Sequence, residues 1–151
     1  MICEYLNEKF PEPPLMPTDL AERARARFME EYADTKLIEV LSIPFIENFV
    51  AKRIRKTEPD HERVRHAETV LIPPVLDYVE SCLPEDGFLF GHFCTVDVSL
   101  MTHAVNAEVG NYSIDAARWP KYAAYVARVK AHPAVAATLA REAEVMATAL
   151  G

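Results

Sequence analysis

The sequence predicts an all-α protein, a helical bundle, and three observations support this fold class. Hydrophobic residues recur with the 3.6-residue period of an α-helix over most of the 151 residues. No run of alternating polar and apolar residues indicates a β-strand, and the chain has only 4 glycines for tight hairpins. The hydrophobic content of 50% is enough to fill the core of one domain. We therefore expect one helical domain, residues 18–151, preceded by a short segment, residues 1–17.

Prolines and capping residues set the bounds of the first helices. Residues 2–9 are predicted to form a short helix, and four prolines between residues 11 and 17 impose an extended connector, because proline fixes its own φ and restricts its predecessor. A long helix then begins after Thr18 or Asp19, either of which can cap it, and continues toward Lys56. Its apolar positions are Leu20, Ala24, Phe28, Tyr32, Leu37, Val40 and Leu41.

Prolines also occur inside both predicted long helices. Pro44 removes a backbone donor, so a kink is expected there that reorients the residues that follow. A second helix begins near Pro59 or Asp60 and continues past the Pro73-Pro74 pair, which is a difficult sequence for a helix interior. The face that we expect this helix to bury consists of Val64, Ala67, Val70, Leu71, Val75, Leu76 and Val79.

A third helix is predicted from a capping box in the segment 88–100, FLFGHFCTVDVSL. Cys94 occupies the N-cap position, and Asp97 occupies the third helical position, where an acid can accept a hydrogen bond from the N-cap N–H. We expect Asp97 to be a structural cap. Helix positions expected to be mostly buried are Val98, Met101, Ala104 and Val105. A loop follows at 111–118, and helices are expected at 119–131 and 134–149, the first of them with Pro120 in its first turn.

This helix start resembles a motif of the cytosolic glutathione transferases of bacterial type. In that family a Gly-x-x-Ser/Thr-x-x-Asp segment opens the central helix of the C-terminal domain. Gly91 and Asp97 match it, while Cys94 stands where the family usually has Ser or Thr. Residues 1–17 resemble the last helix of the family's thioredoxin-like domain and the linker after it, and residues 119–135 resemble its closing helices. The resemblance implies the all-α fold of the C-terminal domain.

The resemblance also implies a function. In the family, glutathione is the co-substrate, and the thioredoxin-like domain holds it and activates its thiol. The helical domain contributes the site for the apolar electrophile. Because almost none of a thioredoxin-like domain is present in residues 1–17, we expect this chain to bind no cofactor by itself, to contain no catalytic residue, and to be inactive alone. A homodimer and a role in detoxification are implied for the complete protein.

Seven side chains are candidates for the electrophile site, by their position on the family's kinked first helix and its third helix. They are Thr35, Ser42, Phe45, Ile46, Phe49, His103 and Asn106. The alternative for the three apolar residues is that they belong to the core, because an apolar stripe at helical spacing is more often core than pocket. For His103 the alternative is a buried imidazole that is hydrogen-bonded to a neighbour.

Composition argues against several classes of partner. A net charge of −7 disfavours a nucleic-acid surface. The basic cluster formed by Lys52, Arg53, Arg55 and Lys56 is interpreted as a helix end, with an anionic-ligand site as the alternative. No apolar run reaches the length of a membrane span, and no basic segment followed by an apolar core opens the chain, so we expect a soluble cytoplasmic protein without a membrane partner.

The three cysteines have no CxxC spacing, which disfavours both a disulfide framework and a zinc site. No metal site is predicted. For Cys94 the alternative to a capping role is a reactive thiol, since a helix N-terminus lowers the pKa of a thiol. For the whole chain, the alternative to the enzyme half is a non-catalytic module that binds proteins or apolar ligands.

Overall fold

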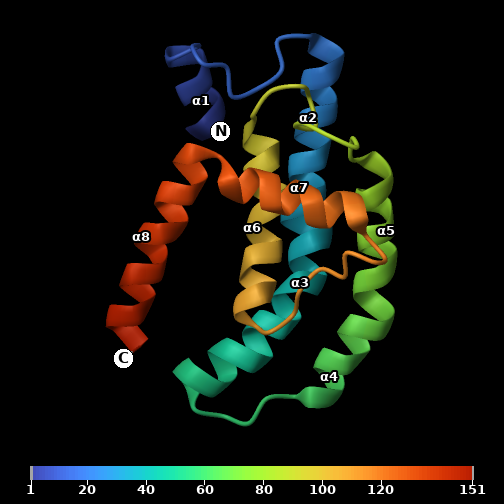
Figure 1. Ribbon diagram of the computed structural model, residues 1–151, viewed down its shortest axis with the longest axis vertical. Coiled ribbons are helices and arrows are strands. Elements are labelled where there is room, and N and C mark those ends of the chain that lie inside the picture. The colour runs from blue at the N-terminus through green and yellow to red at the C-terminus, as the bar shows by residue number, and fades with distance from the viewer. Residues whose placement is uncertain (1, 151) are drawn as a thin grey trace.

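The architecture is all-α, as predicted. The computed structural model describes residues 2–150, with side chains described up to residue 148, and no strand occurs among these residues. With η for a π-helical segment, the elements are α1 (Ile2–Lys9), α2 (Leu20–Tyr32), η1 (Ala33–Leu37), α3 (Ile38–Pro44), η2 (Phe45–Arg55), α4 (His61–His66), η3 (Ala67–Leu71), α5 (Ile72–Cys82), α6 (Thr95–Val109), α7 (Pro120–Ala131) and α8 (Pro133–Leu150). Figure 1 shows α6 in the middle of the bundle, beside α2 and α3 and crossed by α7.

The first long helix is one continuous helical run from α2 to η2. Asp19 is its N-cap, and its carboxylate accepts hydrogen bonds of 2.9 Å from the backbone N–H groups of Ala21 and Glu22. Lys56 ends the run in the left-handed conformation, with φ of 56°. The basic cluster predicted at a helix end lies in this last turn. Both predicted limits of the helix are therefore confirmed.

Wider π-helical turns accommodate the internal prolines. Pro44 ends α3, and the π-helical segment η2 begins at the next residue. The Pro73-Pro74 pair lies in the first turn of α5, directly after the π-helical segment η3. π-turns and prolines are both recognised causes of kinks. In Figure 1 the teal segment after α3 leaves the direction of α2 and α3, so the predicted kink is present.

The central helix α6 is buried on several sides. It packs against α2, α3 and α7, and its fully buried residues include Val96, Leu100 and Ala107. The Tyr122 hydroxyl donates a 2.7 Å hydrogen bond to the Leu100 carbonyl, which ties α7 to the middle of α6. Polar groups this deep in a core are stable only when they are paired. The core therefore forms around α6.

Several apolar positions of the predicted helices are exposed. They are Leu20, Ala24, Phe28, Val70, Leu71 and Val98. Periodicity identifies the apolar face of a helix, but burial also requires a second element that covers this face. Leu20 is the first residue of α2 and is 79% exposed, and Phe28, further along the same helix, is 55% exposed. The expectation of burial was wrong for Val70, Leu71 and Val98.

None of the helices in the described part of the chain combines the length and the apolar content needed to cross a lipid bilayer.

Candidate functional site

Two aromatic side chains form a stacked pair on η2. The ring centroids of Phe45 and Phe49 lie 5.4 Å apart with an interplanar angle of 17°. Residues four apart lie on one face of a helix, so the local structure brings the rings together. Both side chains are only half-buried. The pair therefore presents an aromatic surface rather than filling the core.

This aromatic surface forms one wall of an apolar groove. The groove has a volume of about 880 Å³ and lies between η2, the last turns of α6, and α8. Its apolar lining consists of Phe45, Phe49, Val105, Val109, Leu139, Ala143, Val145 and Met146, and its polar lining of Asn106, Lys130, Thr138, Arg141 and Glu142. Small-molecule sites in proteins have similar volumes and linings. Three of the predicted site residues, Phe45, Phe49 and Asn106, are brought together here.

A second hollow of about 360 Å³ shares part of this lining. Val105, Asn106 and Leu139 line both spaces. The second hollow extends toward Phe93 and Val135, at the junction between α7 and α8. There the Phe93 ring stacks on the His132 imidazole, with centroids 3.8 Å apart and an interplanar angle of 5°. This stack fixes the point from which α8, the third wall, extends away from the bundle (Figure 1).

Buried polar contacts hold the η2 wall in place. Glu47, only 9% exposed, binds the Arg63 guanidinium at 2.7 Å and accepts a hydrogen bond from the Asp60 N–H at 3.0 Å. This carboxylate ties η2 to the start of α4. Sequence analysis missed Glu47, because nothing in its sequence surroundings distinguishes it from an exposed helix acid.

The other predicted site residues do not line this groove. Thr35 is exposed on η1, and its hydroxyl donates a 2.6 Å hydrogen bond to the Glu31 carbonyl, one turn earlier. Ser42 and Ile46 are half-buried on the same helical run. The seven predicted residues therefore do not form one cluster. Five of them are spread over four turns of the first long helix, and residues so spread cannot all face one side.

His103 is buried on α6, away from the groove lining. Its Nε2 atom is 3.8 Å from Asp34 Oδ1 and has no hydrogen-bond partner. Burial lowers the pKa of His103, and the Asp34 carboxylate opposes this shift only in part. His103 is therefore buried, as the alternative reading expected, and its nearest charged neighbour is Asp34.

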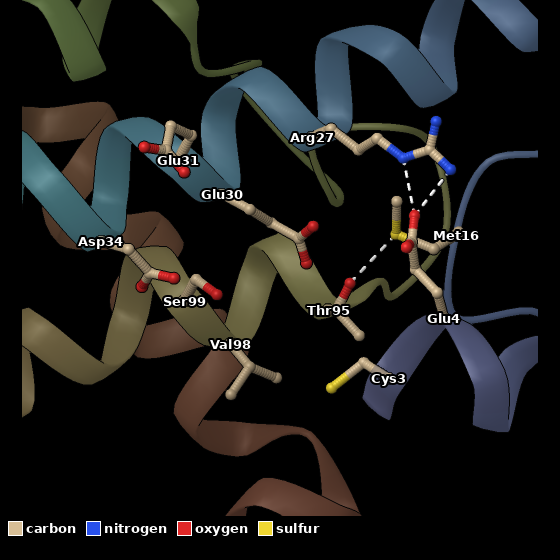
Figure 2. A pocket seen from close by; sticks show the side chains of 10 residues that line it. All are labelled: Cys3, Glu4, Met16, Arg27, Glu30, Glu31, Asp34, Thr95, Val98 and Ser99. Atoms are coloured by element: carbon tan, nitrogen blue, oxygen red, sulfur yellow. Dashed lines mark hydrogen bonds and ion pairs between the residues drawn. The ribbon is translucent and has the colours of Figure 1, made fainter. Parts of the chain in front are cut away.

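A polar pocket lies at the first turns of α6, against α1 and α2 (Figure 2). It has a volume of about 560 Å³ and is lined by Cys3, Glu4, Met16, Arg27, Glu30, Glu31, Asp34, Thr95, Val98 and Ser99. Four of these side chains are carboxylates, and Arg27 is paired with Glu4 at 2.6 Å. An acidic lining disfavours an apolar or anionic ligand. Sequence analysis missed this pocket, because its residues come from four distant parts of the chain.

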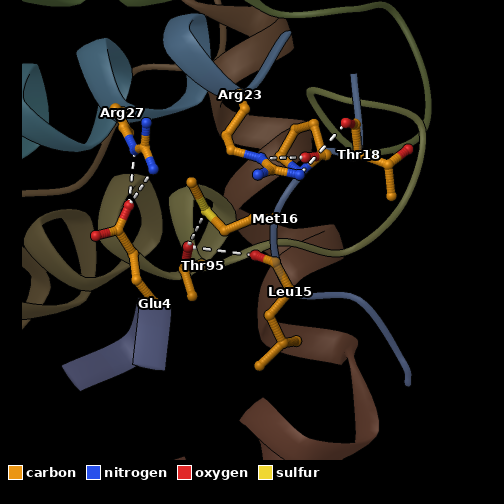
Figure 3. A network of polar contacts seen from close by, with 8 residues as sticks. Glu4, Leu15, Met16, Thr18, Arg23, Arg27 and Thr95 are labelled. Carbon is orange, nitrogen blue, oxygen red and sulfur yellow. Dashed lines mark hydrogen bonds and ion pairs between the residues drawn. The ribbon is translucent and has the colours of Figure 1, made fainter. Parts of the chain in front are cut away.

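The connector after α1 is bound to the start of α6 (Figure 3). The Thr95 backbone N–H donates to the Leu15 carbonyl at 3.0 Å, and its hydroxyl contacts the Met16 sulfur at 3.1 Å. Arg23 on α2 donates to the Pro17 carbonyl at 2.9 Å. These contacts, together with the pairing of Arg27 and Glu4, hold α1 against the bundle.

Cys94 is not a reactive thiol. Its side chain is fully buried, and burial together with the nearby Asp97 carboxylate raises its pKa to about 12. Its sulfur lies 3.4 Å from the His92 Nε2 atom. The dipole of the helix N-terminus would lower a thiol pKa, but desolvation is the larger effect here. The alternative of an activated nucleophile at this position was wrong.

Asp97 has the predicted capping role. Its Oδ2 atom accepts a 2.6 Å hydrogen bond from the Cys94 backbone N–H, and Cys94 is the N-cap of α6. Its Oδ1 atom also accepts hydrogen bonds from the Leu89 N–H and the Tyr125 hydroxyl. With these donors the carboxylate is satisfied by structural contacts, and it is fully buried.

Comparison with known proteins supports the same fold. No protein-family model matches the chain. Over 134 residues the chain is 30% identical to a maleylacetoacetate isomerase of Pseudomonas aeruginosa, and this match covers 88% of the chain and 60% of that protein. The chain thus spans less than two thirds of the length of this relative.

Two solved structures are similar to the chain. A glutathione S-transferase from Rhodospirillum rubrum F11 matches with a TM-score of 0.76 and 24% identity, over 89% of this chain and 60% of that one. A glutathione S-transferase from Methylobacterium radiotolerans JCM 2831, solved in complex with glutathione sulfonate, matches with a TM-score of 0.65 and 24% identity, over 89% and 62%. The resemblance stated from the sequence is confirmed: the chain has the fold of the helical C-terminal domain of the glutathione transferases.

Proposed function

We propose that this chain is the electrophile-binding half of a glutathione transferase-like enzyme. The observation that carries the proposal is the groove of about 880 Å³ with the stacked rings of Phe45 and Phe49 on one wall. An apolar ligand in this groove removes aromatic and aliphatic surface from water, which favours binding. The transferase fold and the glutathione derivative bound to the Methylobacterium relative support glutathione as the co-substrate.

The proposed reaction is attack of the glutathione thiolate on an apolar electrophile. With a chlorinated nitroarene, a sulfur–carbon bond forms and chloride leaves with the electron pair of the carbon–chlorine bond. This step requires a positioned thiolate with a lowered pKa. The cation Lys130 at the groove is already paired with Glu108 at 2.7 Å, and the Cys94 thiol is buried. We therefore assign thiol activation to a thioredoxin-like domain and expect the chain alone to be inactive.

A fusion experiment tests this proposal. A thioredoxin-like domain from a bacterial glutathione transferase is joined ahead of Ile2, and conjugation of glutathione to a chlorinated nitroarene is measured for fused and unfused chains. Turnover is expected only in the fusion. In the fusion, Phe45→Ala and Phe49→Ala should raise KM for the nitroarene more than KM for glutathione. The control is Ile54→Ala, an exposed apolar residue on the same segment η2.

Two outcomes would contradict the proposal. Turnover by the unfused chain would require a thiol activator within it. An active fusion whose nitroarene KM is unchanged in both phenylalanine variants would exclude the groove as the electrophile site. An inactive fusion that still binds apolar dyes in the groove would favour the alternative, a non-catalytic module for apolar ligands.

We also infer a homodimer that forms through an aromatic surface on α2 and α5. The Phe28 and Tyr32 rings lie 6.3 Å apart, and the Tyr32 and Tyr78 rings lie 4.6 Å apart. Phe28 is 55% exposed and Tyr78 is 38% exposed, beside a hollow of about 500 Å³. Exposed apolar surface of this kind is typical of an association surface.

Light scattering should show a dimer that Phe28→Glu converts to a monomer, and a monomeric parent at high concentration would contradict the inference. The cytoplasmic location and the role in detoxification remain predictions.

A further inference from the structure

We propose that Asn48 and Gly110 set the width of the apolar groove and thereby the size of the ligand that it accepts. The inference rests on the proposed function, since it concerns the same groove. Asn48 lies on η2, between Phe45 and Phe49 in the sequence, and Gly110 follows the last residue of α6. The contact between these two residues, which we call the clasp, joins two walls of the groove. Both are positioning residues, because neither lines the groove.

Gly110 allows the end of α6 to touch the kinked backbone at Pro44. A Cβ atom at position 110 would lie 2.4 Å from the Phe45 nitrogen, 2.4 Å from the Pro44 carbonyl carbon and 2.6 Å from the Pro44 oxygen. All three atoms are backbone atoms, so no side chain could rotate away to make room. The φ of Gly110 is −82°, which any residue can adopt. The requirement for glycine is therefore one of space, and it brings α6 into direct contact with the residue that carries the first ring.

Asn48 locks this contact with a hydrogen bond. Its Nδ2 atom donates to the Gly110 carbonyl at 2.7 Å, and the side chain is half-buried. Because Asn48 precedes Phe49 directly and lies one turn after Pro44, this bond fixes the helical turn that bears both rings. The carbonyl of Gly110 lies beyond the α6 helix, where the backbone has no helical partner of its own.

The clasp controls the separation of two walls but not the position of the third. Val105 and Val109 lie in the last turns of α6, just before Gly110, and face the rings across the groove. The α8 wall extends from the separate junction at His132. Loss of the clasp should let the turn of η2 that bears the rings move away from α6, while Glu47 still binds Arg63 on α4. A wider groove should hold a small ligand less well and a bulky ligand better.

The test uses two dyes of different size, 1-anilinonaphthalene-8-sulfonate and the larger bis-ANS, on the 151-residue chain. The parent and five variants are titrated, and the ratio of the two dissociation constants is the readout. Phe45→Ala first shows whether the dyes occupy the groove. Asn48→Ala and the isosteric Asn48→Asp, which cannot donate to a carbonyl, should each shift the ratio toward bis-ANS by at least about threefold, the factor expected for one hydrogen bond.

Two further variants complete the test. Asn48→Gln, which keeps the amide donor, should restore part of the parent's ratio. The matched control is Arg128→Ala, which removes a side-chain hydrogen bond of the same 2.7 Å length to another glycine carbonyl, that of Gly87, and an ion pair with Asp86; neither Arg128 nor Gly87 lines the groove. Its ratio should equal that of the parent. Circular dichroism and urea midpoints confirm that each variant is folded.

The outcomes separate this inference from the proposed function. Dye binding that does not occur, or that is unchanged in Phe45→Ala, overturns the groove as a ligand site and the clasp with it. If Phe45→Ala weakens dye binding, the groove is the dye site. If Asn48→Ala and Asn48→Asp then both keep the parent's ratio of dissociation constants, the clasp alone is overturned. An equal loss of affinity for both dyes also overturns it, because the bond would then only support the fold.

Discussion

The Tyr125 hydroxyl on α7 donates a hydrogen bond to the Asp97 carboxylate at the start of α6. The same carboxylate accepts hydrogen bonds from the backbone N–H groups of Cys94 and Leu89. Burial raises the pKa of Asp97, and these three hydrogen bonds oppose the shift. The cap of α6 is therefore also the contact that joins α6, its preceding loop and α7.

Asp97→Ala should destabilise the protein by about 3 kcal/mol, because it leaves three donors without an acceptor, two of them buried. Tyr125→Phe removes a single donor and should cost about 1 kcal/mol. Urea unfolding of both variants measures these free energies. Equal midpoints for Asp97→Ala and the parent would contradict the capping role.

The three cysteines should differ widely in their reaction with a thiol reagent. Cys3 is exposed, Cys82 is half-buried, and Cys94 is fully buried with its pKa raised to about 12. Only a thiolate reacts, so Cys3 should react first and Cys94 only after unfolding. Mass spectrometry of the native protein after labelling identifies the modified residues. If Cys94 in the native protein were modified as fast as Cys3, the conclusion that the Cys94 side chain is buried would be contradicted.

The stability of the protein should fall in alkaline solution. The pKa of Cys94 is raised from 9.0 to about 12, and that of Tyr112 from 10.0 to about 12, in both cases mainly by burial. The unfolded chain therefore loses these protons first. Their contribution is complete below the unfolded values and is lost as the pH rises from about 9 to about 12.

Cys94→Ser should reduce the first part of this alkaline loss, from about pH 9, because the Cys94 thiol of the unfolded chain titrates at a lower pH than Tyr112 does. Urea midpoints measured at several pH values for parent and variant test this. A parent whose midpoint is constant over this range would contradict the raised pKa of Cys94.

His103 should make the protein sensitive to acid. Its pKa is lowered from 6.5 by burial, so below this value the unfolded chain takes up a proton that the folded chain does not. The stability that neutral His103 contributes is thus present above about pH 6.5 and is lost as the pH falls toward the folded pKa. The carboxylate of Asp34, 3.8 Å away, limits the shift.

His103→Gln should flatten the dependence of the urea midpoint on pH as the pH falls below about 6.5. In Asp34→Asn the urea midpoint should depend more steeply on pH than in the parent, since this variant lacks the charge that favours protonated His103. An unchanged dependence in both variants would mean that another group titrates in this range.

Most of the fold could be predicted from local sequence signals. Asp19, Asp60 and Cys94 are N-caps as predicted, because capping depends on residue type and a few neighbours. The effect of Pro44 and Pro73 on their helices could be predicted from the sequence. The π-helical turns next to these prolines could not, because no single residue type indicates a π-helical turn. The exposure of Phe28 and Val98 could not be predicted, because it depends on which element lies opposite.

The candidate site could be predicted only in part. Phe45 and Phe49 were candidates through the resemblance, which places them on the family's kinked first helix, and both line the groove. The α8 wall of the groove was not predicted, since the direction of α8 depends on the stack of Phe93 on His132. The clasp could not be found either, because Asn48 and Gly110 lie far apart in the sequence and meet only in the folded chain.

Nuclear magnetic resonance tests the central claim, that the groove between η2, α6 and α8 binds apolar ligands. Methyl resonances of the isotope-labelled chain are followed while 1-anilinonaphthalene-8-sulfonate is added. The account predicts saturable shifts for Val105, Val109, Leu139 and Met146, which line the groove, and no shift for the core residues Leu76 and Val79. Shifts confined to residues outside the groove, or no saturable shift in any of the four, would contradict the account.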